Sequence, residues 1–435
     1  MGVIMKIINV ICILLLHVLF PQQIASAIKN RCRRSYEALH GVYEIRIIGN
    51  ILIFPIKLVL SLSLAIIKIV FIWILPASVY YNIKFAIYNL IYEDITVKKI
   101  RPRIALKRVY LFFVMCVKGR QRRVSYGEKN PDKTFFVIRP YYFLERNELV
   151  QNVSNLLFHY YRNLQHLAYG LENGWIPVVD WENYGPFAHG EKFPINGTRN
   201  CWEYYWQQPS PYTLEEVYQS KNVILSVQNT RDNQYVPSCF FSKNLQKQAE
   251  DLAVRCPKYD MNICLNEYTK IYIDSLQKDL FKDGKKILGV SVRGTSYGNP
   301  DVLTNVSGHP IQPDLVTLIN SVDNLMQEWK MDYIFITCEL DSIINDFKNH
   351  FGNKTLYIPR LRYTKSPQRG DVEKGLDPLY VEGNKYKTNL DYLAEMVLLS
   401  RCNSLAAAMS SGVRAAIIWN ANKYEHMKIF ENGLW

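Results

Sequence analysis

The stretch KILGVSVRGTSY, residues 286–297, decides the fold class of this chain. Its apolar run is short and is bounded by residues typical of turns, which is the pattern of a central strand in a parallel sheet. The run ends at Arg293. Ligands of open α/β sheets bind beyond the carboxyl ends of the strands, where the planar fork of an arginine suits phosphate oxygens. The alternative is that Arg293 pairs with a surface carboxylate.

Strands and helices alternate on both sides of this stretch, which is typical of an α/β protein. Two such sets imply two doubly wound α/β domains, 131–285 and 286–435, with a ligand cleft between them. We predict further strands over 135–138, 175–180, 223–227, 333–337, 355–358 and 404–408. We predict helices over 148–173, 214–220, 245–255, 266–283, 312–330, 341–351 and 389–401, and one more that opens at residue 410.

The first 130 residues differ in composition from the rest. They hold 20 Lys/Arg against 5 Asp/Glu, whereas residues 131–435 hold 32 against 34. The basic residues lie among long apolar runs and form no groove with interleaved aromatics, which favours anionic lipid over nucleic acid as the partner. We therefore predict that residues 1–130 form a helical region that associates with a membrane.

Two apolar runs support this prediction. Residues 58–75 contain one charge, Lys68, and have about the minimum length for a transmembrane helix, with a helix lying in the membrane interface as the alternative. Residues 1–27 imitate a signal peptide, either cleaved or retained. Residues 84–123 contain eleven basic and two acidic side chains. The positive-inside rule therefore predicts that this segment, and the domain after it, are cytoplasmic.

Three loops at predicted strand ends contain groups that suit a nucleotide diphosphate. In a parallel sheet these loops leave the same edge, and the third opens a helix whose N–H groups favour anions. The alternatives are a Ser-Ser-Gly turn that only caps its helix and a loop acid that is only solvated. The loops supply Arg293, Gly294 and Thr295; Thr337 and Glu339; and Ser410, Ser411 and Gly412.

The order GVSVRGT (289–295), FITCE (335–339) and SSG (410–412) resembles that of bacterial cell-surface polysaccharide glycosyltransferases, which are relatives of the α1,2-, α1,6- and protein O-fucosyltransferases. The resemblance covers about residues 134–435. It implies a GT-B fold, in which two Rossmann-like domains face a cleft. It also implies inverting transfer from a GDP-sugar, usually GDP-fucose, with no metal and no cofactor. The stretches HLAY (166–169), GWIPVVD (174–180), WEYY (202–205), LEEVY (214–218) and GHPIQP (308–313) are also similar.

The resemblance implies a role for each loop. Arg293 would bind the donor β-phosphate and steady the departing GDP. Thr337 and Glu339 would lie near the guanosine, and Ser410 and Ser411 would bind phosphate oxygens. The acceptor would be a surface polysaccharide or a lipid-linked oligosaccharide, and the expected location is the cytoplasmic face of a bacterial inner membrane.

The chain departs from this pattern at two positions. Relatives commonly have an acid where Ser296 stands, and they often have Thr-Glu-Asp where this chain has Thr-Cys-Glu followed by Leu340. The candidates for the general base are His309, Asp301 and Glu339, since a histidine can deprotonate a hydroxyl near neutral pH. The alternative is that His309 only orders its loop. Besides a glycosyltransferase, we therefore consider a family member that binds nucleotide-sugar or glycan without turnover, and an interaction scaffold.

Overall fold

The computed structural model describes residues 122–139, 155–183, 189–226, 235–238, 241–294, 309–365, 379 and 383–434. All of them belong to the second of the two compact units of the chain, Gln121–Trp435. The predictions for residues 1–121, including the transmembrane or interfacial run 58–75, lie outside the described residues. In the part of the chain that the structure describes, no helix is both long enough and apolar enough to cross a membrane.

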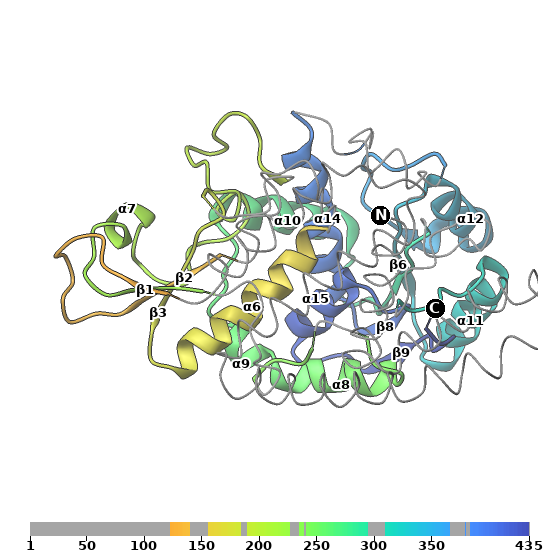
Figure 1. Ribbon diagram of the computed structural model, residues 1–435. Helices are drawn as coiled ribbons and strands as arrows, with labels where there is room; N and C mark the ends of the chain where they lie inside the picture. Colours follow the sequence, from red (N-terminus) through yellow and green to blue (C-terminus); the bar gives the residue numbers. More distant parts are fainter. Residues whose placement is uncertain are drawn as a thin grey trace, which may run out of the picture. The chain divides into compact units, whose positions relative to one another are not determined.

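The second half of this unit is built around a parallel five-stranded sheet (Figure 1). The strand that contains residues 287–291 lies at its centre and pairs in parallel with a neighbour on each side. This confirms the central parallel strand that the sequence predicts. The strand order is β7-β6-β5-β8-β9, with bounds β5 Ile287–Ser291, β6 Tyr333–Thr337, β7 Thr355–Leu356, β8 Ser404–Ala407 and β9 His426–Ile429.

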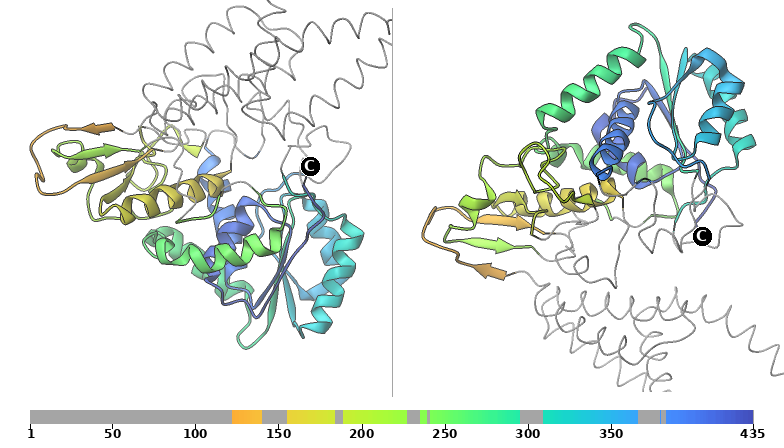
Figure 2. Two further views of the ribbon diagram at one scale, coloured as in Figure 1. Left: turned by 60° about the horizontal axis from the view of Figure 1, so that its bottom comes forward. Right: turned by 90° about the horizontal axis from the view of Figure 1, so that it is seen from above.

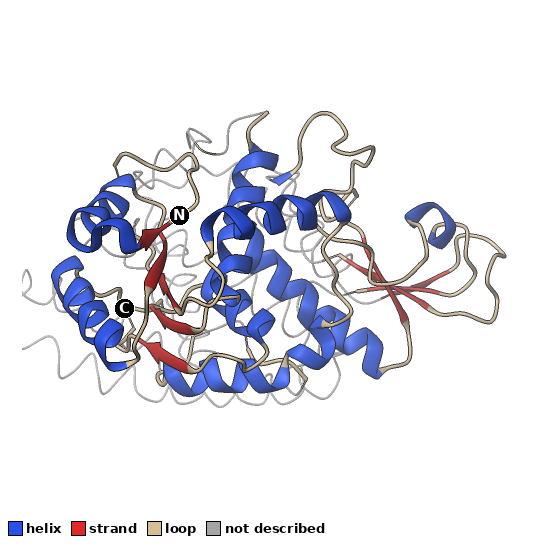
Figure 3. Cartoon of the chain, turned by 180° about the vertical axis from the view of Figure 1, so that it is seen from behind, coloured by secondary structure: helices blue, strands red, loops and turns tan. Residues whose placement is uncertain are grey.

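Helices pack against both faces of this sheet (Figures 2 and 3). One face carries α11 (Leu315–Glu328) and α12 (Asp341–Phe351). A short 3₁₀ helix, η2 (Gly352–Lys354), follows α12 directly. The other face carries α14 (Lys385–Ser400) and α15 (Ser411–Asn420). The second half is therefore doubly wound, as predicted.

The central strand β5 is buried on both faces, which explains its continuous apolar sequence. Leu288 and Val290 pack in the core beneath α11 and α12. Gly289 faces α14, where a Cβ atom would lie 2.7 Å from Cδ1 of Leu399. A glycine at this position therefore lets helix and strand approach closely.

The first half is built around a four-stranded sheet. This sheet contains both parallel and antiparallel strand pairs, whereas the sequence predicts a parallel one. Strand β2 pairs in parallel with β3 and β4, whereas β1 pairs with β4 in antiparallel orientation at the edge. Strand β1 is not predicted from the sequence, because its three residues, RRV, include only one apolar side chain. The strands are β1 Arg122–Val124, β2 Phe135–Ile138, β3 Ile176–Val179 and β4 Val223–Leu225. The helices are α6 Leu156–Glu172, α7 Leu214–Val217, α8 Leu245–Arg255, α9 Pro257–Asp260 and α10 Glu267–Leu280.

The two halves share one apolar core. Helix α15 of the second half contacts α6, α8 and α9 of the first, and α14 contacts α10. The aromatic rings of Tyr160, Trp206 and Trp419 meet in this cluster. The mixed α/β class is thus established, while the GT-B arrangement and the domain boundary at residue 285 remain predictions.

Several helix and strand ends differ from the predicted ones. Helix α6 begins at Leu156 instead of residue 148, because Asn155 has an extended backbone and its side chain accepts a hydrogen bond from the N–H of Phe158 at 2.9 Å. Helix α10 ends at Leu280, and α14 begins four residues before the predicted start, at Lys385. The predicted strand 355–358 pairs only over its first two residues.

Candidate functional site

The carboxyl ends of β5, β6 and β8 lie side by side. Ser291, the last residue of β5, is in register with Thr337 of β6 and with Ala407 of β8. The ladder continues past the strands, since Val292 N–H donates to the carbonyl of Thr337 at 3.2 Å and Ala408 N–H donates to that of Ser291 at 3.1 Å. The three predicted loops therefore leave the same edge of the sheet.

The first two loops form an ion pair. Nε of Arg293 lies 3.8 Å from a carboxylate oxygen of Glu339, and each side chain keeps about a quarter of its surface exposed, 26% and 28%. The N–H of Arg293 donates to the side-chain oxygen of Gln312 at 3.2 Å, which fixes the backbone where β5 ends. The sequence allows the alternative that Arg293 pairs with a surface carboxylate. The carboxylate it meets is that of Glu339, which is itself a residue of the predicted site.

Gly294 allows the first loop to turn beside the second. Its φ is +71°, in the left-handed region. A Cβ atom there would lie 2.7 Å from Sγ of Cys338 and 2.9 Å from Cδ1 of Ile343. Both conditions favour glycine. Thr295, Ser296 and Asp301, which follow in the same loop, lie outside the described residues.

The side chain of Thr337 points into the protein. The residue is 1% exposed, and the structure gives its hydroxyl no hydrogen-bond partner among the residues it describes. A buried hydroxyl without a hydrogen-bond partner lowers the stability of the fold by about 1–3 kcal/mol. The predicted contact of Thr337 with the guanosine stays a prediction.

A buried cluster of charges, which the sequence analysis missed, holds the backbone next to Glu339. Arg360 and Arg362, in the segment after β7, donate to the carbonyl of Cys338 at 3.3 and 3.0 Å. Both arginines contact the carboxylate of Glu395 on α14, at 2.9 and 2.6 Å, and all three side chains are at most 3% exposed. The cluster therefore connects α14 to the loop that presents Glu339.

His309 lies in the same region, on the segment that leads into α11. Its ring centroid is 5.4 Å from that of Phe241. Burial is the main cause that lowers the pKa of His309, and together with the positive charges of Arg293 and Arg414 it brings that pKa to about 4. At neutral pH the imidazole is therefore uncharged and its basic nitrogen carries no proton.

Arg414 is a second arginine of this region that the sequence analysis missed. It lies on α15, one turn after Ser410, whose carbonyl accepts its N–H at 3.0 Å. The residue is 1% exposed, and its guanidinium carbon lies 3.9 Å from the ring centroid of Phe241 and 5.5 Å from that of Tyr161. Its spacing from the Ser-Ser-Gly turn, one helical turn, is the signal that could have identified it.

The Ser-Ser-Gly turn begins α15, as predicted. The hydroxyl of Ser410 accepts a hydrogen bond from the N–H of Val413 at 3.2 Å, so this serine is an N-cap. Ser411 is the first residue of the helix and is partly exposed. The cap is the local role that the structure shows for Ser410, and the binding of phosphate by Ser410, Ser411 and Gly412 stays a prediction.

A pocket of about 720 Å³ lies at the carboxyl side of β6 and β7. It is lined by the start of α12, the segment after β7 and the start of α14, and Arg360 and Arg362 are among its lining residues.

Among the described residues, no three His, Cys, Asp or Glu side chains are grouped so that they could hold a metal ion.

No protein-family model and no curated protein matches this chain. Among solved structures, fucosyltransferase NodZ from Bradyrhizobium is 13% identical, with a TM-score of 0.35, over 65% of this chain and 92% of that one. POFUT1 in complex with GDP-fucose is 10% identical, with a TM-score of 0.29, over 69% and 74%. A variant of Arabidopsis thaliana FUT1 in complex with GDP is 9% identical, with a TM-score of 0.33, over 66% and 68%. With TM-scores this low, what this chain does has to be inferred from its own residues.

Proposed function

We propose that this chain is a glycosyltransferase that transfers fucose from GDP-fucose to a surface polysaccharide or a lipid-linked oligosaccharide, with inversion and without a metal ion. The observation that carries the proposal is the meeting of three loops at one edge of a parallel sheet. These loops contain the motifs by which the chain resembles the fucosyltransferase superfamily. That resemblance supplies the GT-B arrangement, the donor and the stereochemistry of the proposal.

Arg293 is the residue that meets the leaving group in this proposal. During transfer, the bond between the anomeric carbon and the β-phosphate oxygen breaks, and that oxygen gains negative charge. A guanidinium positioned beforehand stabilises this charge. The partial exposure of Arg293 and its loose, 3.8 Å approach to Glu339 support this role, because a phosphate can compete for the same donors.

Glu339 and the start of α15 complete the proposed donor site. The carboxylate of Glu339 accepts hydrogen bonds from the base or the ribose, and Thr337 lies beside it. The N–H groups at the start of α15, with Ser410, Ser411 and Gly412, bind phosphate oxygens. Gly294 and Thr295 bring the backbone of the first loop close to the same phosphates.

We assign the general base to His309. It takes the proton of the acceptor hydroxyl while that oxygen bonds to the anomeric carbon and GDP departs. A pKa of about 4 makes His309 a weak base in the unliganded protein. A bound diphosphate brings negative charge next to Arg293, which offsets the positive charge that lowers the pKa of His309. A bound donor therefore relieves part of the electrostatic repulsion at His309, while burial, the main cause of its low pKa, persists.

We also propose that residues 1–130 hold the chain at the cytoplasmic face of a bacterial inner membrane. Their excess of 15 positive charges and their long apolar runs support this. A membrane surface is where a lipid-linked or growing surface glycan would be met.

One observation favours the alternative of binding without turnover. Leu340 stands where relatives often have an acid, and its Cδ1 lies 3.4 Å from the position that a Cβ of Gly294 would occupy. An apolar side chain thus lies beside the loop of Arg293, at a position where the resemblance leads us to expect a carboxylate.

Assays of the full chain with GDP-fucose, GDP-mannose and UDP-sugars separate these functions. Binding of GDP-sugars together with release of GDP, in the presence of a glycan acceptor or by slow hydrolysis, supports the transferase. Binding without GDP release supports the non-catalytic alternative. A folded chain that binds none of the nucleotides contradicts both.

A further inference from the structure

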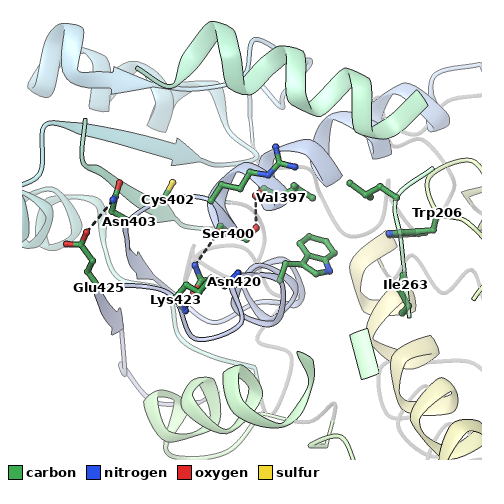
Figure 4. Close-up of a pocket in the computed structure, with 12 residues that line it drawn as sticks. Trp206, Ile263, Val397, Ser400, Cys402, Asn403, Asn420, Lys423 and Glu425 are labelled. Carbon is green, nitrogen blue, oxygen red and sulfur yellow. Dashed lines mark hydrogen bonds between the residues drawn. The ribbon is translucent and has the colours of Figure 1, made fainter. Parts of the chain in front are cut away.

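A pocket of about 550 Å³ lies at the edge of the five-stranded sheet opposite the three donor loops (Figure 4). Asn403 lies directly before β8 and Glu425 directly before β9, so these lining residues mark the amino ends of the strands. The donor loops follow the carboxyl ends of β5, β6 and β8. The pocket is therefore separate from the proposed donor site, and none of its lining residues belongs to the three donor loops.

One side of the pocket is aromatic and apolar. Trp206 and Ile263 of the first half lie across the pocket from the polar residues of the second half (Figure 4). Trp419, which also lines the pocket, is only partly buried. Its indole N–H donates to the hydroxyl of Tyr160 at 2.8 Å, which fixes the orientation of the ring. The pocket thus contains an immobilised tryptophan on which a flat, partly apolar group can stack.

The other side is polar, and its groups are already held in place. The side-chain oxygen of Asn403 accepts the N–H of Ile287 at 2.9 Å, and its amide group donates to Glu425 at 3.3 Å. The guanidinium of Arg401 is held by Asp274 at 2.8 Å. Polar groups that are ordered before binding lose little entropy when a ligand arrives, which favours recognition.

One positive charge of the pocket, that of Lys423, has no carboxylate partner among the residues that the structure describes. The carboxylate of Glu425 is paired with Lys286 at 2.6 Å, and Arg401 is paired with Asp274. Lys423, another lining residue, is exposed, and no carboxylate of the described residues forms an ion pair with its ammonium group. A ligand with a negative charge therefore suits the pocket better than a neutral one.

From these contacts we infer that this pocket binds an acidic oligosaccharide. A sugar ring stacks one face on Trp419 and directs its hydroxyls to Asn403 and Arg401, and a carboxylate of the glycan meets Lys423. The choice of a carbohydrate over another ligand with one apolar face rests on the proposed function, because a glycosyltransferase for a polymer meets glycan on both sides of the bond it makes. The pocket would then hold a part of the glycan that is remote from the hydroxyl that reacts.

Calorimetric titration of the full chain with trigalacturonate, maltotriose and inorganic phosphate tests this inference. We expect trigalacturonate to bind, and Lys423→Ala and Trp419→Ala each to weaken its binding at least tenfold. Two matched controls, Lys270→Ala and Tyr268→Ala, change exposed residues of α10 that do not line the pocket, and their binding should equal that of the wild type. Lys423→Ala removes an exposed side chain, so its result stands even if Trp419→Ala unfolds.

A parallel titration with GDP separates this inference from the proposed function. Binding of trigalacturonate with equal affinity in the absence and presence of saturating GDP supports a separate site, whether or not GDP itself binds. The inference is overturned if trigalacturonate does not bind, if GDP displaces it, or if Lys423→Ala binds as the wild type does. Equal binding of maltotriose or of phosphate alone also overturns it, because the pocket would then select no acidic glycan.

Discussion

Replacing Glu395 by Gln tests the buried charge cluster behind the candidate site. Its carboxylate contacts Arg360 at 2.9 Å and Arg362 at 2.6 Å, and its side chain is 1% exposed. Glutamine keeps the shape of the side chain but removes the negative charge that both buried guanidinium groups contact. Removing one partner of a buried ion pair costs about 3–5 kcal/mol. Because the cluster holds the carbonyl of Cys338, the variant should also bind GDP more weakly than the wild type.

Urea-induced unfolding of the full chain, followed by circular dichroism, measures the first effect. Asp274→Asn is the matched control, because it breaks the exposed Arg401–Asp274 pair, whose side chains are 30% and 46% exposed. Such surface pairs contribute about 0–1 kcal/mol. The interpretation of the cluster is wrong if Glu395→Gln loses no more stability than Asp274→Asn, or if it binds GDP with unchanged affinity.

Three further predictions concern a carboxyl group, a glycine and an arginine. Burial raises the pKa of Asp260 from 3.8 to about 7, so the folded state keeps a proton that the unfolded chain releases. The free energy of unfolding should therefore fall as the pH rises from about 4 to about 7, by at most roughly 4 kcal/mol. Urea titrations at several pH values should show this slope for the wild type and not for Asp260→Asn. Gly294→Ala should lower the thermal midpoint more than Gly284→Ala, which has a similar positive φ, +69°, but an unobstructed Cβ position, and equal shifts would refute the steric argument. Arg414→Met should raise the pKa of His309 above about 4, as followed by the imidazole proton resonances, and an unchanged pKa would show that the arginine does not act on this histidine.

The elements that the sequence predicts to the residue are those whose apolar pattern and end signals agree. The predicted strand 333–337 is β6, and the predicted helices 245–255 and 341–351 are α8 and α12. In α12 the helix ends where Gly352 takes a φ of +58°, as a glycine after a helix predicts. Strand β9 is not predicted, because its sequence, HMKI, is half exposed and has no clear apolar pattern.

The candidate site is predicted in its position but not in its side-chain contacts. Parallel strand order is enough to place the three loops at one edge. It does not show that Arg293 faces Glu339, nor that the side chain of Thr337 is buried. Charged residues such as Arg414 and Glu395 look solvent-facing in a helical sequence, because only tertiary packing reveals that they are buried.

Binding of GDP by the wild-type chain and by Arg293→Ala is the decisive test of the proposed donor site. Arg401→Ala is the control, because it removes another partly exposed arginine that belongs to none of the three donor loops. We predict that GDP binds the wild type and Arg401→Ala equally, and that Arg293→Ala binds it roughly 10- to 100-fold more weakly, because the variant loses a charge-assisted hydrogen bond. Equal GDP affinity in Arg293→Ala and the wild type, or no binding by the folded wild type, would contradict it.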